Sequence, residues 1–131
     1  FQGEASQLVG RLVGPQPGER VLDLCAAPGG KTCHLAEQMD DRGRLVAVDI
    51  AAGGVGRIRA EAARLGLGCI EAVVADGARW APADGEVFDR VLVDAPCTGL
   101  GTLRQHPEIR WRRSAADVGR NAALQRRLLQ H

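Results

Sequence analysis

The side chain best placed for covalent chemistry is Cys97, in the sequence Asp94-Ala95-Pro96-Cys97 that follows an apolar run. A thiolate can add to carbon 6 of a cytosine or uracil ring, and the resulting enamine can attack a sulfonium methyl group through carbon 5. A cysteine beside a cofactor site is therefore what methylation of a pyrimidine carbon requires. The alternative is a small buried apolar residue, the common fate of a free cysteine, but a Pro-containing loop after a strand favours the functional interpretation.

A second chemical feature is the stretch 21–32, VLDLCAAPGGKT, in which a Pro-Gly-Gly turn joins an apolar run to the start of a helix. This layout is typical of a backbone cradle for a nucleotide-like ligand. The dinucleotide motif G-x-G-x-x-G is not present. Gly30-Lys31-Thr32 matches the end of the phosphate-loop motif, but Cys25 stands where its first glycine belongs and Pro28 removes a backbone donor. A P-loop nucleotide hydrolase is thus the weaker alternative.

Acids after the next two apolar runs favour S-adenosylmethionine as the ligand of this cradle. Asp49, twenty positions after Gly29, is placed to accept hydrogen bonds from both ribose hydroxyls, and Asp76 to accept one from the adenine amino group. A glycine-rich turn lets the backbone approach the methionine part of the cofactor. Either acid alone would more often cap a helix or end a strand in solvent. The turn and the two acids together favour a methyl donor.

The apolar patterns predict the elements that must bring these residues together. We expect strands over 21–26, 44–50, 70–75 and 88–95, helices over 6–13, 31–39, 55–65 and 115–130, and a long loop over 98–113. The first helix should place Leu8, Val9, Leu12 and Val13 on one face. Mostly apolar strands that alternate with helices predict an α/β fold with a parallel sheet flanked by helices. Ligands bind at the carboxyl ends of such strands, so the candidate residues should meet at one edge of the sheet.

Composition limits the class of protein. With 131 residues, 45% of them hydrophobic, the chain is long enough for one domain with a core. A net charge of +1 gives no overall field that would favour nucleic acid. No apolar run reaches the length of a membrane span, and no leader is evident, so we expect no membrane association. The four cysteines form no C-x-x-C pair, which favours the reducing cytoplasm, and the scattered histidines make a metal site unexpected.

Basic residues gather in the last quarter of the chain. Those of the predicted loop are Arg104, His106, Arg110, Arg112 and Arg113. Guanidinium groups with an indole, here Trp111, suit RNA phosphates and unstacked bases. The alternative is a solvated basic loop in which Trp111 packs back onto the domain.

Four stretches of the sequence resemble the motifs of one known family. They read LDLCAAPGGKT, VAVDI, VVADGAR and DAPCTGLGTLRQHPEIRW. The family is the Nop/Sun-type RNA cytosine-5 methyltransferases, and the chain most resembles its bacterial, RsmB-like branch, which modifies small-subunit ribosomal RNA. The opening FQGEASQLV and the closing ALQRRLL also resemble this family, so the resemblance covers essentially the whole chain. Gln105 departs from the arginine that is frequent there, which weakens the expected RNA contact.

The resemblance implies a Rossmann-like methyltransferase fold, RNA as partner, and S-adenosylmethionine as cofactor. The implied cofactor-binding residues are Cys25, Ala26, Ala27, Pro28, Gly29, Gly30, Lys31, Asp49, Asp76 and Asp94. The implied catalytic residues are Cys97 and Asp94, where Cys97 assists release of the methylated base. The family's nucleophile is a different cysteine, in a Thr-Cys motif after the next strand of the sheet.

The sequence ends before that next strand, and the family's amino-terminal RNA-binding domain is likewise missing from it. We therefore expect part of a catalytic domain, with its C-terminal strands absent. Its expected parts are a leading helix and turn (1–18), cofactor-binding strands and helices (19–95), and a Pro-Cys loop with a C-terminal helix (96–131). Such a part should bind S-adenosylmethionine without methylating RNA. The remaining alternative is a non-catalytic RNA-binding fragment.

Overall fold

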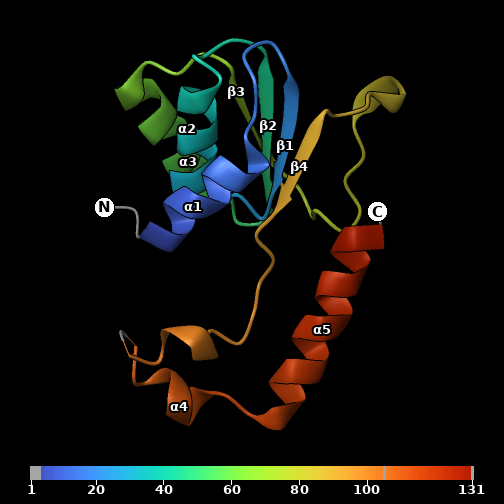
Figure 1. Ribbon diagram of the computed structural model, residues 1–131. Helices are drawn as coiled ribbons and strands as arrows, with labels where there is room; N and C mark the ends of the chain where they lie inside the picture. Colours follow the sequence, from blue (N-terminus) through green and yellow to red (C-terminus); the bar gives the residue numbers. More distant parts are fainter. Residues whose placement is uncertain (1–3, 105, 131) are drawn as a thin grey trace. The chain divides into compact units, whose positions relative to one another are not determined.

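A computed structural model describes residues 4–104 and 106–130 (Figure 1). The chain divides into two compact units, Phe1–Asp94 and Ala95–His131. The first holds the sheet and the second holds the segment after Asp94. Within the described residues, no helix has the length and apolarity needed to cross a bilayer.

The first unit is built on a four-stranded parallel sheet. Its order is β3 (Ile70–Val74), β2 (Arg44–Asp49), β1 (Arg20–Leu24) and β4 (Arg90–Val93). Leu24 pairs with Val48 on one side and with Val93 on the other, so β1, β2 and β4 end at nearly the same level. The predicted parallel sheet is confirmed, and the carboxyl ends of its strands lie along one edge (Figure 1).

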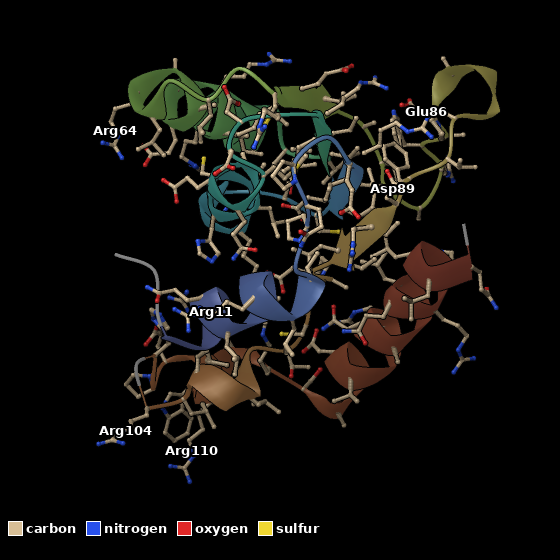
Figure 2. The ribbon with its side chains drawn as sticks, turned by 45° about the horizontal axis from the view of Figure 1, so that its top comes forward. Arg11, Arg64, Glu86, Asp89, Arg104 and Arg110 are labelled. Atoms are coloured by element: carbon tan, nitrogen blue, oxygen red, sulfur yellow. The ribbon has the colours of Figure 1, made fainter. Side chains whose placement is uncertain are left out.

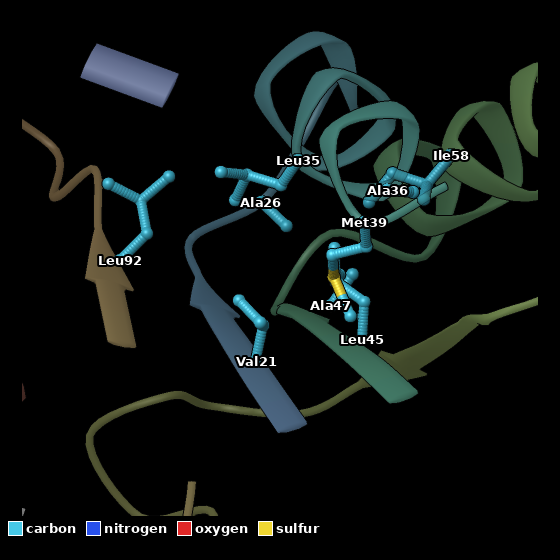
Figure 3. Packing of buried hydrophobic residues seen from close by; sticks show 9 residues of the cluster. All are labelled: Val21, Ala26, Leu35, Ala36, Met39, Leu45, Ala47, Ile58 and Leu92. Atoms are coloured by element: carbon cyan, nitrogen blue, oxygen red, sulfur yellow. The ribbon is translucent and has the colours of Figure 1, made fainter. Parts of the chain in front are cut away.

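Three helices belong to the first unit: α1 (Glu4–Val13), α2 (Gly30–Gln38) and α3 (Ala52–Leu65). On the helix-covered face of the sheet, Leu35 and Met39 of α2 and Ile58 of α3 pack with Val21 and Leu45, all fully buried (Figure 3). The other face buries a smaller cluster beneath the segment between β3 and β4, which includes the short 3-10 helix η1 (Ala83–Gly85). That cluster comprises Leu22, Leu24, Val46 and Val48, with Trp80 and Phe88 against it. The core thus fixes β1 and β2 from both sides.

The predicted first helix forms as α1, and its apolar residues differ in burial. Only Val9 and Val13 pack against the core, whereas Leu8 and Leu12 are 57% and 78% exposed. Val9 and Val13 are four residues apart and share a helical stripe, while Leu8 and Leu12 form the adjacent stripe. The four apolar residues together span a wide arc of the helix surface, and only the part that carries Val9 and Val13 packs against the core of the first unit.

The turn between α2 and β2 uses backbone in the left-handed region. Asp40 and Asp41 both have φ 52, in the left-handed region, and Gly43 has φ 108. The Asp41 carboxylate accepts hydrogen bonds from the backbone N–H groups of Gly68 and Cys69 at 2.9 and 2.7 Å. Asp41 therefore ties the start of β2 to the start of β3.

The second unit contains η2 (Leu100–Thr102), α4 (Ile109–Arg112) and α5 (Ala115–Gln130). The bounds of α5 agree with the prediction, and its first turn carries a capping arrangement in which the Asp117 carboxylate accepts from the N–H and hydroxyl of Ser114. The loop predicted over 98–113 is partly wrong, because it includes η2 and the single turn α4. Sequence periodicity cannot detect a helix of four residues.

Candidate functional site

The site begins where β1 ends. Cys25 has φ 62, the N–H of Ala26 donates to the carbonyl of Val48 at 3.1 Å, and the N–H of Gly29 donates to the carbonyl of Ala26 at 2.9 Å. The helix α2 then begins at Gly30 without a side-chain cap. The first-turn N–H groups of such a helix have no intrahelical acceptor and favour an anionic ligand group.

Two glycines let this turn lie against α3. Gly29 has φ 105, and a Cβ there would lie 2.9 Å from Cγ1 of Ile58. A Cβ on Gly54, in the first turn of α3, would lie 2.6 Å from the Cβ of Ala27. Contacts that short do not occur between real side chains, so both positions require glycine. The turn is therefore held by close packing as well as by hydrogen bonds.

Asp49 links the end of β2 to the turn. Its Oδ2 accepts from the N–H of Ala27 at 3.0 Å, and its Oδ1 accepts from the N–H of Ala51 at 2.8 Å. Each carboxylate oxygen can accept a further hydrogen bond. The half-buried Asp49 thus orients the turn and keeps acceptor capacity for ribose hydroxyls.

Lys31 and Asp94 bring the turn together with the end of β4. The Lys31 Nζ donates to Oδ2 of Asp94 at 2.7 Å, and the two side chains are 25% and 54% exposed. A cavity of about 470 Å³ opens beside this pair. Its lining includes Cys25, Ala26, Ala27, Pro28, Gly30, Lys31 and Asp94. Most of the predicted cofactor-binding residues therefore share one cavity.

Gly29, Asp49 and Asp76 do not line that cavity. Asp76 lies one residue beyond Ala75, whose N–H donates to the carbonyl of Asp49 at 3.0 Å, so it is adjacent to the end of β2. Its Oδ1 accepts from the N–H of Ala78 at 3.0 Å, which is a turn-forming contact. The structure joins Asp49 to the turn, and it gives Asp76 a local structural contact.

Asp23, next to the last residue of β1, was not among the predicted site residues. It lines the cavity and is 1% exposed, and its Oδ2 accepts from the hydroxyl of the buried Thr32 at 2.7 Å. Its Oδ1 is the one buried side-chain polar atom without a hydrogen-bond partner in the part of the chain that the structure describes. Burial raises the pKa of Asp23 to about 7, and the negative charges of Asp94 and Asp49 add to the effect. An acid inside the apolar run VLDL was the available sequence signal.

A model of the family described as 16S rRNA methyltransferase RsmB/F matches residues 11–131. The chain belongs to this family. The predicted resemblance is therefore confirmed, and so is the fold, since the α/β sheet flanked by helices matches structures of S-adenosylmethionine-dependent methyltransferases.

Individual relatives match nearly all of this chain, whereas the chain covers only part of each relative's own length. Ribosomal RNA small subunit methyltransferase B of Pseudomonas syringae pv. tomato is 46% identical over 98% of this chain and 29% of its own length. The human tRNA (cytosine(72)-C(5))-methyltransferase NSUN6 is 41% identical over 98% of this chain and 29% of its own length. The crystal structure of NSun6 from Pyrococcus horikoshii with SFG gives a TM-score of 0.88 at 30% identity, over 98% of this chain and 33% of that one. The chain thus spans about 29% of the length of the curated relatives it matches.

The geometry argues against the P-loop alternative. A P-loop presents its Ser or Thr hydroxyl to Mg²⁺ and its lysine to the phosphates. Here the Thr32 hydroxyl is fully buried and donates to Asp23, while Lys31 donates to Asp94. Among the described residues, no group of three or more His, Cys, Asp or Glu side chains could hold a metal ion.

Three of the four thiols are poorly suited to act as nucleophiles. Burial and the charge of Asp49 raise the pKa of Cys25 to about 11, and burial and Asp41 raise that of Cys69 to about 12. Burial also raises the pKa of Cys33. Thr32 and Cys33 are the same two residue types as the Thr-Cys motif that the resemblance implies for the nucleophile. Both, however, are buried in α2. Cys97, in the second unit, is exposed.

The predicted RNA-binding residues all belong to the second unit. The guanidinium of Arg110 lies 6.0 Å from the ring centroid of Trp111, and Trp111 is 85% exposed. Arg113 donates to the carbonyl of Thr98 at 3.0 Å. The His106 Nδ1 lies 3.3 Å from Oε1 of Glu108. Arg104 and Arg110 extend outward in Figure 2, and Arg112 is likewise exposed.

Proposed function

We propose that this chain is the S-adenosylmethionine-binding part of an RNA cytosine-5 methyltransferase that acts on small-subunit ribosomal RNA. The observation that carries the proposal is the shared cavity, in which the turn after β1 meets Asp94 through the Lys31 hydrogen bond. Cys97 follows Asp94 by three residues in the sequence. We assign the cofactor to residues 19–95, and RNA to the Pro-Cys loop and C-terminal helix of residues 96–131.

The residues of the site fit the cofactor part by part. Turn residues Cys25 to Lys31 would hold the methionine part, because Gly29 and Gly54 permit close backbone approach. Asp49 would accept from the ribose hydroxyls with the lone pairs that its backbone hydrogen bonds leave free. Asp76 would accept from the adenine amino group. When bound, S-adenosylmethionine would supply the methyl group.

Methyl transfer also needs a thiolate, and we propose that it comes from a cysteine outside these 131 residues. The raised pKa values of Cys25, Cys33 and Cys69 support this, because a protonated thiol is a weak nucleophile. Cys97 would assist release of the methylated base. A polypeptide of these residues alone should therefore bind the cofactor and leave RNA unmethylated.

Ribosomal RNA is proposed over transfer RNA on the basis of the bacterial relatives. The P. syringae ribosomal enzyme is 46% identical to this chain and the human tRNA enzyme is 41% identical. The exposed basic residues of the second unit suit either RNA. The proposal includes a cytoplasmic location, with which four free cysteines agree.

The test uses the full-length enzyme that contains this chain. Transfer of tritium from labelled S-adenosylmethionine would be measured on small-subunit ribosomal RNA and on tRNA. Label in cytosines of ribosomal RNA is expected. Label in tRNA alone would contradict the proposed substrate, and label in neither would contradict the proposed activity.

Release by Cys97 is tested with Cys97→Ala in the same full-length enzyme. A covalent protein–RNA adduct should accumulate, because the base would add to the nucleophile and fail to leave. A denaturing gel would show it as a retarded band that the wild type lacks. A gel without that band would remove the release role from Cys97.

A further inference from the structure

Cys97 lies in a segment whose backbone does not hold itself in place. Residues 95–98 belong to no helix or strand, and among the described residues no backbone–backbone hydrogen bond involves them. Cys97 is also exposed, so packing alone does not fix it. Backbone carbonyls outside regular secondary structure bond to side chains or to water. A single conformation of this segment therefore depends on side-chain donors.

Two side chains from later parts of the second unit supply such donors. The Nε2 of Gln125, in α5, donates to the carbonyl of Pro96 at 2.9 Å. The Nε of Arg113, between α4 and α5, donates to the carbonyl of Thr98 at 3.0 Å. These carbonyls belong to the residues immediately before and after Cys97. The thiol is thus flanked by two side-chain hydrogen bonds.

Both donors are themselves held by α5. Arg113 directly precedes Ser114, whose N–H and hydroxyl donate to the Asp117 carboxylate at 2.7 and 3.0 Å. This capping interaction fixes the chain at the start of the helix. Gln125 lies within the same helix, less than one turn before the buried Leu128. The helix α5 therefore carries one donor, and its N-terminal cap orients the other.

The release step assigned to Cys97 needs accurate placement. In that step carbon 5 of the cytosine gives its proton to a general base, the ring double bond re-forms, and the electron pair of the carbon 6–sulfur bond returns to the nucleophile. A group that assists must lie within reach of the reacting atoms, and a small displacement can cost a large factor in rate. Resting on the proposed function, we propose that Gln125 and Arg113 are positioning residues that hold the segment around Cys97 in the conformation that release requires.

Gln125 gives the cleaner test, because it carries no charge. Gln125→Glu keeps the length of the side chain and removes the donor, so the Pro96 carbonyl would face a carboxylate. In the full-length enzyme, turnover on small-subunit ribosomal RNA should fall about 10-fold, while methyl transfer in the first turnover should keep the wild-type rate. A covalent protein–RNA adduct should accumulate on a denaturing gel. Gln130→Glu, the same change at an exposed position of α5, is the control and should show neither effect.

These readouts separate positioning from a loss of folded protein. Partial unfolding lowers the amplitude of first-turnover methylation and leaves no adduct, because the remaining enzyme releases its product normally. In the Cys97→Ala background, Gln125→Glu should leave the amount of adduct unchanged, since the side chain that it positions is already gone. A further increase in adduct would show an effect that does not pass through Cys97, and would overturn the inference.

Arg113→Lys tests the second donor and keeps the positive charge that the predicted RNA contact needs. Lysine lacks the planar fork whose Nε holds the Thr98 carbonyl. The kcat on ribosomal RNA should fall, whereas the affinity for RNA, measured by fluorescence anisotropy, should change little. Weaker RNA binding with an unchanged kcat would remove the positioning role from Arg113.

The adduct gel decides between the outcomes. An adduct in both Cys97→Ala and Gln125→Glu, and none in Gln130→Glu, would support the inference. An adduct in Cys97→Ala alone would overturn it and leave the proposed function standing, whereas no adduct in either would overturn the release role on which it rests. If Gln125→Glu fails to fold, Gln125→Met, which has a similar length and helix propensity, replaces it with the same expected adduct, and the absence of that adduct overturns the inference.

Discussion

Asp49 combines a structural and a proposed binding task in one carboxylate. It accepts from the backbone N–H groups of Ala27 and Ala51, and so it fixes the turn relative to the end of β2. The ribose-binding role of Asp49 was predicted from its position twenty residues after Gly29. Its hydrogen bonds to the backbone were not predicted, because they depend on how the turn and the start of α3 fold around it.

Replacement of Asp49 should separate these two tasks. Asp49→Ala should weaken S-adenosylhomocysteine about 10- to 100-fold, since it removes the ribose acceptor and loosens the turn. Asp49→Asn retains one acceptor oxygen and should give a smaller loss. Calorimetric titration of both variants would show the order, and wild-type affinity in Asp49→Ala would remove the ribose assignment.

Among the elements, α3 packs directly against the turn after β1. Gly54 faces Ala27 so closely that a methyl group has no room, whereas Gly56 of the same helix has nothing within 4 Å of its would-be Cβ. The sequence AGGVGRIR shows glycines without distinguishing these two. Only the packing of α3 against the turn does so.

Gly54→Ala and Gly56→Ala therefore form a matched pair. Gly54→Ala should lower the free energy of unfolding by about 1–3 kcal/mol, as overpacking does, and should also weaken cofactor binding. Gly56→Ala should raise it by about 0.5–1 kcal/mol, because alanine is the better helix former. Urea denaturation would measure both. Equal effects at the two positions would contradict the close contact with Ala27.

The sequence was sufficient for the elements with strong patterns and insufficient for contacts made in three dimensions. The parallel sheet, α2, α3 and α5 follow from apolar periodicity and from breakers such as Gly66, which ends α3 with φ 70. Three features depend on which residues from other parts of the chain pack nearby. They are the exposure of Leu8 and Leu12, the single turn α4, and the unpaired oxygen of Asp23. Such information is not contained in local spacing.

For the molecule as a whole, we propose that the first unit binds the cofactor and the second binds RNA. Arg110 and Arg112 lie in α4 beside the exposed Trp111. In the full-length enzyme, Arg112→Ala should reduce the slope of log affinity for single-stranded RNA against log salt by about 0.7, the value for one lost phosphate contact. Arg42→Ala, in an exposed ion pair of the first unit, is the control and should leave the slope unchanged.

The slope would be obtained from fluorescence anisotropy titrations over a series of salt concentrations. An unchanged slope in Arg112→Ala would exclude a phosphate contact at that residue. A slope reduced equally by Arg42→Ala would show that any lost positive charge has the same effect, and that the second unit has no special part in RNA binding.

The central claim is that the turn after β1 holds a methyl donor rather than a nucleotide triphosphate. Calorimetric titration of the 131-residue polypeptide with S-adenosylhomocysteine, and separately with ATP and Mg²⁺, tests it most directly. We expect saturable binding of S-adenosylhomocysteine at one site and no binding of ATP. Binding of ATP with Mg²⁺, and none of S-adenosylhomocysteine, would contradict it.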